Sequence, residues 1–161
     1  MQKIRFNKYL AEAIGTFVLV FAGCGAIVVN DIYHGAIGHS GIAVVFGLVI
    51  MTMIYSFGNV SGAHFNPAVT FSFFVAKRIS GKDTAFYITS QIIGGLIGGV
   101  VLLLMFPGAA SYGATDPSGG ILQAFIMEVI LTFILMTVIF NVSTGHMEKG
   151  IMAGIAIGGT V

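Results

Sequence analysis

Long apolar segments recur along the chain, and the residues between them are rich in glycine, proline and charged side chains. A helix needs about 20 apolar residues to cross a bilayer whose hydrocarbon core is about 30 Å thick. Four segments approach this length and predict membrane-spanning helices: residues 9–29, 41–58, 84–106 and 121–142. A fifth begins near Gly150 and reaches only about 18 Å by Val161 at about 1.5 Å per residue, so we expect the sequence to stop inside a fifth span.

The connection between the second and third predicted spans is too apolar for an ordinary loop. Residues 61–74 contain Pro67, which suits the first position of a helix, and Asn66, which suits the N-cap before it. This pattern predicts a re-entrant half-helix that starts inside the membrane. Non-helical backbone at that depth is tolerated only where it is buried in protein or lines a water-filled cavity, so residues 62–64 predict a cavity.

Two of the predicted spans begin with similar sequences. AEAIGTFVLV at residues 11–20 aligns with MEVILTFILM at residues 127–136. The matched pairs are Glu12 with Glu128, Thr16 with Thr132 and Phe17 with Phe133. The two copies lie on spans of opposite direction, which indicates an inverted repeat. We therefore expect one domain over residues 1–161, with a first repeat at about 1–106 and a partial second repeat at about 121–161 that is incomplete at its carboxyl end.

The composition supports a membrane protein and excludes a water-soluble domain. Hydrophobic residues make up 57% of the chain and charged residues 8%, whereas soluble domains are about 25% charged. A net charge of +1 offers no field that attracts nucleic acid, so the expected surroundings are a lipid bilayer. Lysine and arginine occur only before the first span and in the second and fourth connections. This bias predicts a cytoplasmic N-terminus, and we expect a multi-pass protein of the plasma membrane.

Polar side chains inside the predicted spans need partners. A carboxylate at the centre of a membrane costs at least about 2.5 kcal/mol, so Glu12 and Glu128 each require a reason to be there. In the third span Gln91 is a candidate for a hydrogen bond across helices, with a pore-facing role as the alternative. The same span carries two overlapping pairs of glycines four residues apart, which predict close helix packing: Gly94, Gly95, Gly98 and Gly99.

The sequence gives no sign of reaction chemistry. It has no nucleophile beside a base, no glycine-rich phosphate loop and no cluster with the spacing of metal ligands. The histidines other than His64 lie in other loops, so His64 is expected to anchor its own loop rather than bind a metal. We therefore expect no enzymatic activity, no catalytic residues, no cofactor and no metal.

Taken with the repeat and the span pattern, SGAHFNPAVT at residues 61–70 resembles the aquaporin, or major intrinsic protein, family over essentially the whole chain. FAGCGAIVVN at residues 21–30 is most similar to the nodulin-26-like channels and their bacterial relatives. The resemblance implies an all-α membrane protein with an aquaporin-like helical bundle of six spans and two half-helices. Four full spans, one half-helix and the start of a fifth span are present here. The family usually assembles as a tetramer with one pore per subunit, so the complete protein is expected to be a homotetramer.

The resemblance also implies roles for individual residues. Asn66 would cap the half-helix and offer side-chain N–H groups to a passing molecule, while Phe46 would narrow the pore. Glu12 would accept hydrogen bonds from backbone N–H groups of the loop around His64. Glu128 would do the same for a second loop beyond residue 161, and without that loop it would lack a partner. The complete pore-lining set is Phe46, Gly62, Ala63, His64, Asn66, Pro67 and Ala68, and the loop-orienting set is Glu12, Glu128 and Gln91.

The function that the resemblance implies is passive permeation of water and of small neutral solutes such as glycerol. The second Asn-Pro-Ala motif, the arginine that follows it and the sixth helix are absent from residues 1–161. Phe46 stands where nodulin-26-like channels commonly have tryptophan or a small residue. Two alternatives stay open: a non-conducting short chain that associates with full-length channels, and a pore completed by two short chains of opposite orientation. The uniform lysine and arginine bias opposes the second of these.

Overall fold

The computed structural model describes residues 2–114, 117, 119–143 and 147–161. Within these residues the chain forms six α-helices: α1 (Gln2–Ile32), α2 (Gly38–Ser61), α3 (Pro67–Val75), α4 (Gly81–Met105), α5 (Ile121–Ser143) and α6 (Met147–Thr160). Four described segments are long and apolar enough to cross a membrane: Asn7–Ile32, Gly38–Ser61, Gly81–Met105 and Ile121–Ser143. The all-helical fold and the four spans are those that the apolar pattern predicts.

The short helix α3 begins at Pro67, as predicted, and ends at Val75. Lys77 has a φ of 59°, and its N–H donates to the carbonyl of Phe74 at 2.9 Å. This left-handed turn ends the helix before the basic residues begin. The helix α6 begins at Met147, three residues before the predicted start at Gly150.

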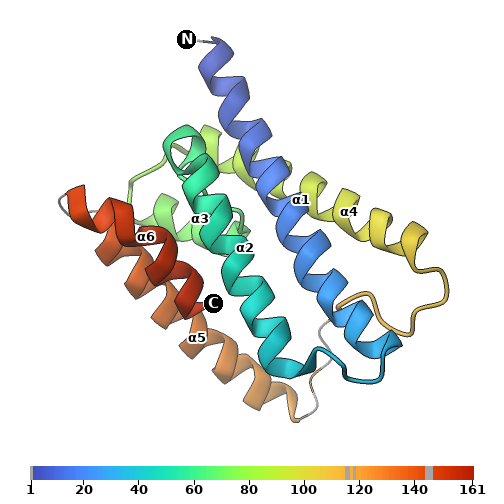
Figure 1. The fold of residues 1–161 in the computed structure, drawn as a ribbon. Helices are drawn as coiled ribbons and strands as arrows, with labels where there is room; N and C mark the ends of the chain where they lie inside the picture. The colour runs from blue at the N-terminus through green and yellow to red at the C-terminus, as the bar shows by residue number, and fades with distance from the viewer. Residues whose placement is uncertain (1, 115–116, 118, 144–146) are drawn as a thin grey trace.

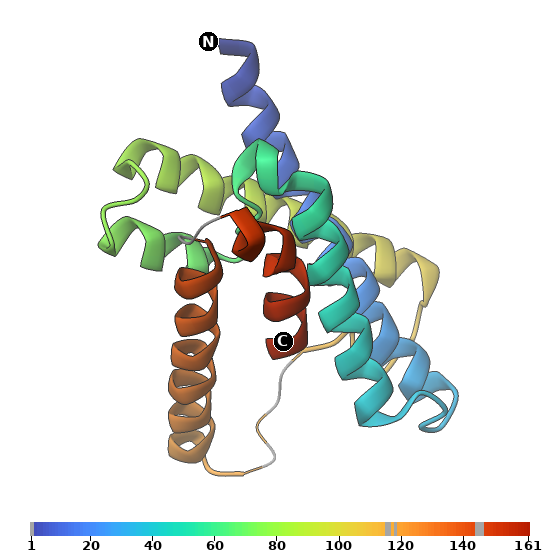
Figure 2. The same ribbon diagram turned by 60° about the vertical axis from the view of Figure 1, so that its left-hand side comes forward.

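The helices form a bundle in which α1 lies against both α2 and α4, α2 lies against α6, and α6 lies against α5 (Figure 1). The half-helix α3 contacts α4. Turning the view shows α5 and α6 side by side, with the upper end of α5 close to α3 (Figure 2). Val69 of α3 meets Met136 and Ile139 of α5 in a small apolar cluster. Elements from residues 1–106 therefore contact elements from residues 121–161.

Glycines allow two pairs of helices to approach closely. A Cβ atom added to Gly94 of α4 would overlap the carbonyl oxygen of Ala13 on α1, and one added to Gly98 would lie 3.1 Å from the carbonyl oxygen of Phe17. A Cβ atom on Gly99 would meet nothing within 4 Å. Within this chain the packing prediction therefore holds for Gly94 and Gly98 and is wrong for Gly99.

The helices α2 and α6 cross even more closely. A Cβ atom on Gly47 would overlap the carbonyl oxygen of Gly158, and a Cβ atom on Gly158 would overlap that of Gly47. The backbones of the two helices are therefore in direct contact at these glycines, as in membrane helix packing through small residues.

The bundle has an apolar exterior and a partly polar interior. Large hydrophobic side chains such as Leu104 on α4 and Ile121 on α5 are 75% and 84% exposed. Among the residues whose burial is described, the buried polar ones are Glu12, Thr16, Ser61, Thr70, Thr84 and Gln91. This inversion suits a protein whose solvent is hydrocarbon, because buried polar groups must then find partners inside the protein.

Candidate functional site

The loop between α2 and α3 has an unusual backbone. The helix α2 ends at Ser61, and its C-cap Gly62 has a φ of 87° and donates its N–H to the carbonyl of Gly58 at 3.0 Å. Ala63 and Phe65 also have positive φ, 53° and 50°. Residues with a Cβ atom lose about 1–2 kcal/mol in this region, so surrounding contacts must hold the loop in place.

The carboxylate of Glu12 provides those contacts. Oε1 accepts hydrogen bonds from the backbone N–H of His64 at 3.0 Å and from the Ser61 hydroxyl at 2.6 Å. Oε2 accepts from the backbone N–H of Phe65 and from Gln91 Nε2, both at 2.7 Å. Glu12 is fully buried. Four donors compensate the carboxylate for its loss of hydration, and the carboxylate in turn satisfies two backbone N–H groups that no helix satisfies.

Gln91 and Thr70 extend this network toward the histidine. Gln91 Nε2 also donates to the Thr70 hydroxyl oxygen at 2.9 Å, and His64 Nδ1 lies 3.1 Å from the same oxygen. The imidazole of His64 stacks on Phe73 of α3 at 4.5 Å between ring centroids and meets the edge of Tyr87 of α4 at 5.2 Å. The histidine side chain is thus held between α3 and α4. Among the described residues no group of three histidine, cysteine or acidic side chains is placed to hold a metal.

Three further contacts hold the loop through residues that the sequence analysis missed as site residues. Tyr87 donates its hydroxyl to the carbonyl of Ser61 at 2.6 Å, and Ser61 Oγ accepts from the backbone N–H of Ala63 at 3.0 Å. Thr16 donates to the carbonyl of Phe65 at 3.3 Å. Thr16 carried a signal, because the internal repeat matches it to Thr132. Tyr87 and Ser61 are single residues in or at the end of a span, and nothing in the sequence marks them as site residues.

The start of α3 has the geometry of a capped helix. Asn66 is extended, with φ −147° and ψ 126°, and its Oδ1 accepts from the backbone N–H of Ala68 at 2.8 Å. Pro67 occupies the first helical turn, where its missing N–H costs nothing. Asn66, Pro67 and Ala68 are exposed in the described part of the chain. The positive end of α3 therefore faces an open region of the bundle.

Phe46 and Glu128 lie apart from the loop. Phe46 is 15 residues before the end of α2 at Ser61, which places it about 22 Å away along the helix axis. Its ring packs against Gly23 of α1, where an added Cβ atom would overlap it. Glu128 is exposed on α5 and does not join the hydrogen bonds around Glu12.

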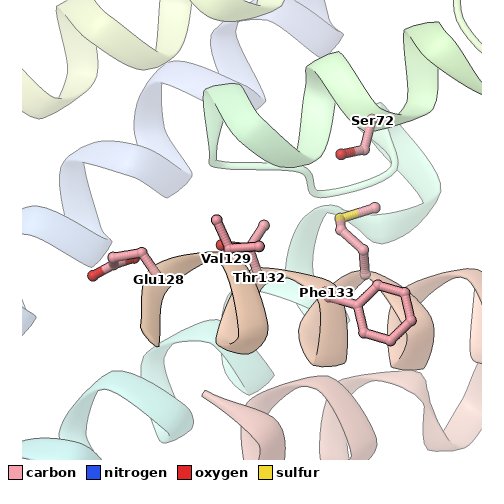
Figure 3. Close-up of a pocket in the computed structure, with 6 residues that line it drawn as sticks. Ser72, Glu128, Val129, Thr132 and Phe133 are labelled. Carbon is pink, nitrogen blue, oxygen red and sulfur yellow. The ribbon is translucent and has the colours of Figure 1, made fainter. Parts of the chain in front are cut away.

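Glu128 instead lines an open cavity of about 450 Å³ between α5 and α3. Val129 and Thr132 of α5 project toward Ser72 of α3, and Glu128 lies at the end of the cavity away from Ser72 (Figure 3). Met136 and Phe133 complete the lining. The Glu128 side chain is exposed rather than desolvated inside the bundle.

The half-helix capped by Asn66 and the loop tied to a buried glutamate match the expectations that the resemblance raised, and a comparison of the sequence decides the family. The family model for Major intrinsic protein matches residues 1–161. The chain belongs to the major intrinsic protein family. It is 44% identical over 156 residues to Nodulin-26 of Glycine max, covering 96% of this chain and 58% of that protein. It is 46% identical over 159 residues to Probable aquaporin NIP4-2 of Arabidopsis thaliana, covering 96% of this chain and 55% of the relative.

The fold also matches a solved structure. The X-ray structure of the aquaglyceroporin from Plasmodium falciparum aligns with a TM-score of 0.78 and 26% sequence identity, covering 96% of this chain and 70% of that one. These matches confirm the aquaporin resemblance and its nodulin-26-like character, and they place the chain among multi-pass membrane channels rather than enzymes. The chain spans a little more than half the length of the curated relatives it matches.

Proposed function

We propose that the chain forms the pore-lining core of a channel for water and for small uncharged solutes such as glycerol. The observation that carries this proposal is the attachment of the loop to Glu12 through the N–H groups of His64 and Phe65. In a trans peptide the carbonyl points opposite to the N–H. The carbonyls of Ala63 and His64 therefore point away from Glu12. The carbonyl of Gly62 likewise points away from Ser61 Oγ, which accepts the N–H of Ala63.

These three carbonyls supply what a permeating neutral molecule needs. A row of acceptors lets water or a polyol exchange hydrogen bonds without complete loss of hydration. Asn66, at the end of the row, offers side-chain N–H groups from the tip of α3. The positive end of α3 adds about +0.5 charge at this point, which disfavours cations and protons but acts weakly on a neutral molecule.

The remaining assignments belong to the same proposal. Pro67 and Ala68 shape the contact beside Asn66, and the ring of Phe46 narrows the pore farther along α2. Glu128 orients a second loop as Glu12 orients the first. We place the protein in the plasma membrane. The bias of lysine and arginine supports a cytoplasmic N-terminus, and family membership supports a homotetramer with one pore per subunit.

The test is osmotic shrinkage of liposomes that contain the purified chain, followed by light scattering with impermeant and glycerol gradients. Ala68 is exposed at the tip of α3, so Ala68→Trp should obstruct the pore and return water permeability to that of empty liposomes. Ala36→Trp, the same change at an exposed position between α1 and α2, should retain the permeability. If the unaltered chain accelerates neither water nor glycerol over empty liposomes, it is not a conducting channel.

The open cavity beside Glu128 favours a second candidate function, a non-conducting chain that associates with full-length channels. The Glu128 carboxylate on the otherwise mostly apolar lining needs polar partners inside a membrane, and a full-length relative is one source of them. Co-expression with a tagged full-length channel distinguishes the two functions. Recovery of the chain in complexes that contain the tagged channel supports the association, and recovery only of self-associated chain argues against it.

A further inference from the structure

A second cavity, of about 340 Å³, opens at the end of the bundle where basic residues gather. We call this end the basic face; it carries Lys8 of α1 and Arg78 and Lys82 around the start of α4. The cavity is lined by side chains from α1, from the end of α2 and the loop after it, from α3 and the α3–α4 connection, and from α4. Its charged residues are Lys8, Arg78 and Asp83. It adjoins the pore loop, because Ser61 and His64 also line it.

The acidic group of the cavity is already neutralised. Lys8 Nζ lies 3.1 Å from Asp83 Oδ2, and the hydroxyl of Tyr9 donates to Asp83 Oδ1 at 2.6 Å. Lys8 also lies over the ring of Tyr87, 5.6 Å from its centroid. Lys8 and Asp83 together therefore leave the cavity with no net charge.

Arg78 gives the cavity its net positive charge. Its guanidinium lies 5.2 Å from the centroid of the Phe140 ring, a stacking contact that limits its motion. Within the part of the chain that the structure describes, no hydrogen bond or ion pair involves the N–H groups of the Arg78 guanidinium. Ser80 accepts the backbone N–H of Asp83 at 3.1 Å, which leaves its hydroxyl proton free to donate into the cavity.

We propose that this cavity binds a phosphate group. An arginine fork matches phosphate oxygens with two parallel hydrogen bonds, and a serine hydroxyl adds a third donor. The segments of α1 and α4 that are long and apolar enough to cross a membrane begin at Asn7 and Gly81, so a bilayer placed around them would bring Lys8 and Arg78 near the lipid phosphates. The phosphate comes either from a membrane lipid head group or from free phosphate in solution.

The test measures binding directly, with purified chain in a maltoside detergent that contains no phosphate. Inorganic phosphate and dihexanoyl phosphatidic acid are titrated separately at constant ionic strength, and the unfolding temperature is followed. A saturable rise with phosphatidic acid alone identifies a lipid as the source, and a rise with inorganic phosphate identifies free phosphate. Arg78→Gln should weaken either affinity at least about tenfold, because a charge-assisted contact is lost.

Lys82→Gln is the matched control, since it removes the same charge from the basic face at a position outside the cavity lining. It should change the affinity by less than about twofold, the effect of one screened surface charge. Arg78→Lys keeps the charge but loses the two parallel donors of the guanidinium. If Arg78→Gln fails to fold, weaker phosphate binding by Arg78→Lys tests the proposal in its place. The proposal is overturned if neither probe binds saturably, or if the Arg78 and Lys82 variants weaken binding equally. Because permeation is not measured, failure of the channel proposal leaves this result intact.

Discussion

Glu12 Oε2 lies 2.7 Å from the backbone nitrogen of Phe65, although 53 positions separate the two residues along the chain. The bond ties the first spanning helix to a loop whose residues Ala63 and Phe65 have positive φ. Such a loop would not keep this conformation on its own, because each of these residues is strained there. The shape of the proposed pore therefore depends on a carboxylate in another helix.

Replacing Glu12 with glutamine should strongly destabilise the chain. The side chain keeps its shape, but one oxygen becomes an NH₂ group that faces donors on either side. A loss of about 1.5–3 kcal/mol is expected, the range for hydrogen bonds to a charged group. The measurement is the unfolding midpoint in mixed micelles, with Asp31→Asn, at an exposed carboxylate, as the control. Equal midpoints for the two variants would show that Glu12 does not hold the loop.

Gln91 should be sensitive to a change of charge rather than of size. Its Nε2 bridges Glu12 and Thr70, and Gln91→Glu would place a second carboxylate in the position now 2.7 Å from Glu12 Oε2. Two carboxylates at this distance repel unless they share a proton, so stability should fall at neutral pH and recover in part in acid. The readout is the unfolding midpoint at pH 7 and pH 5.

The control for this change is Gln123→Glu, on the exposed side of α5. Its midpoint should move little between the two pH values relative to the unaltered chain, because an exposed carboxylate interacts weakly. An equal pH dependence in both variants would exclude a direct interaction between position 91 and Glu12.

The glycines of α4 provide a matched pair for the packing of α1 against α4. Gly94→Ala forces a methyl group into the carbonyl of Ala13, and overpacking of this kind costs about 1–3 kcal/mol. Gly99→Ala meets open space and should be neutral or stabilising, because alanine favours the helix by about 1 kcal/mol over glycine. Thermal unfolding of the two variants tests the assignment. It is wrong if Gly99→Ala is the more damaging change.

The start of α3 could be predicted from neighbouring residues, whereas the conformation of the loop before it could not. Asn66 followed by Pro67 predicts a helix start from adjacent residues alone. A carboxylate such as Glu12 in an apolar segment indicates that it has hydrogen-bond partners, although not which ones. The sequence did not predict the positive φ of Ala63, because residues with a Cβ atom avoid that region unless distant contacts impose it. The sequence did not predict the hydrogen-bond partner of Tyr87 either, because that partner is a backbone carbonyl 26 residues away.

Tyr87→Phe isolates the contribution of that single hydroxyl. The change keeps the ring against His64 and removes only the donor to the Ser61 carbonyl, a bond of 2.6 Å between buried groups. Loss of stability should be about 1 kcal/mol, since one neutral hydrogen bond disappears and a carbonyl is left unpaired. Tyr33→Phe, at a tyrosine that is 64% exposed, should leave the unfolding midpoint unchanged.

Permeability provides a second and more specific readout for Tyr87. The carbonyl of Ser61 belongs to the last turn of α2, directly before the Gly62 turn that starts the proposed acceptor row. If the tyrosine positions this row, liposomes with Tyr87→Phe should shrink more slowly per folded molecule, whereas those with Tyr33→Phe should match the unaltered chain. Reduced stability with unchanged permeability per folded molecule would limit Tyr87 to a packing role and leave Glu12 as the residue that sets the loop.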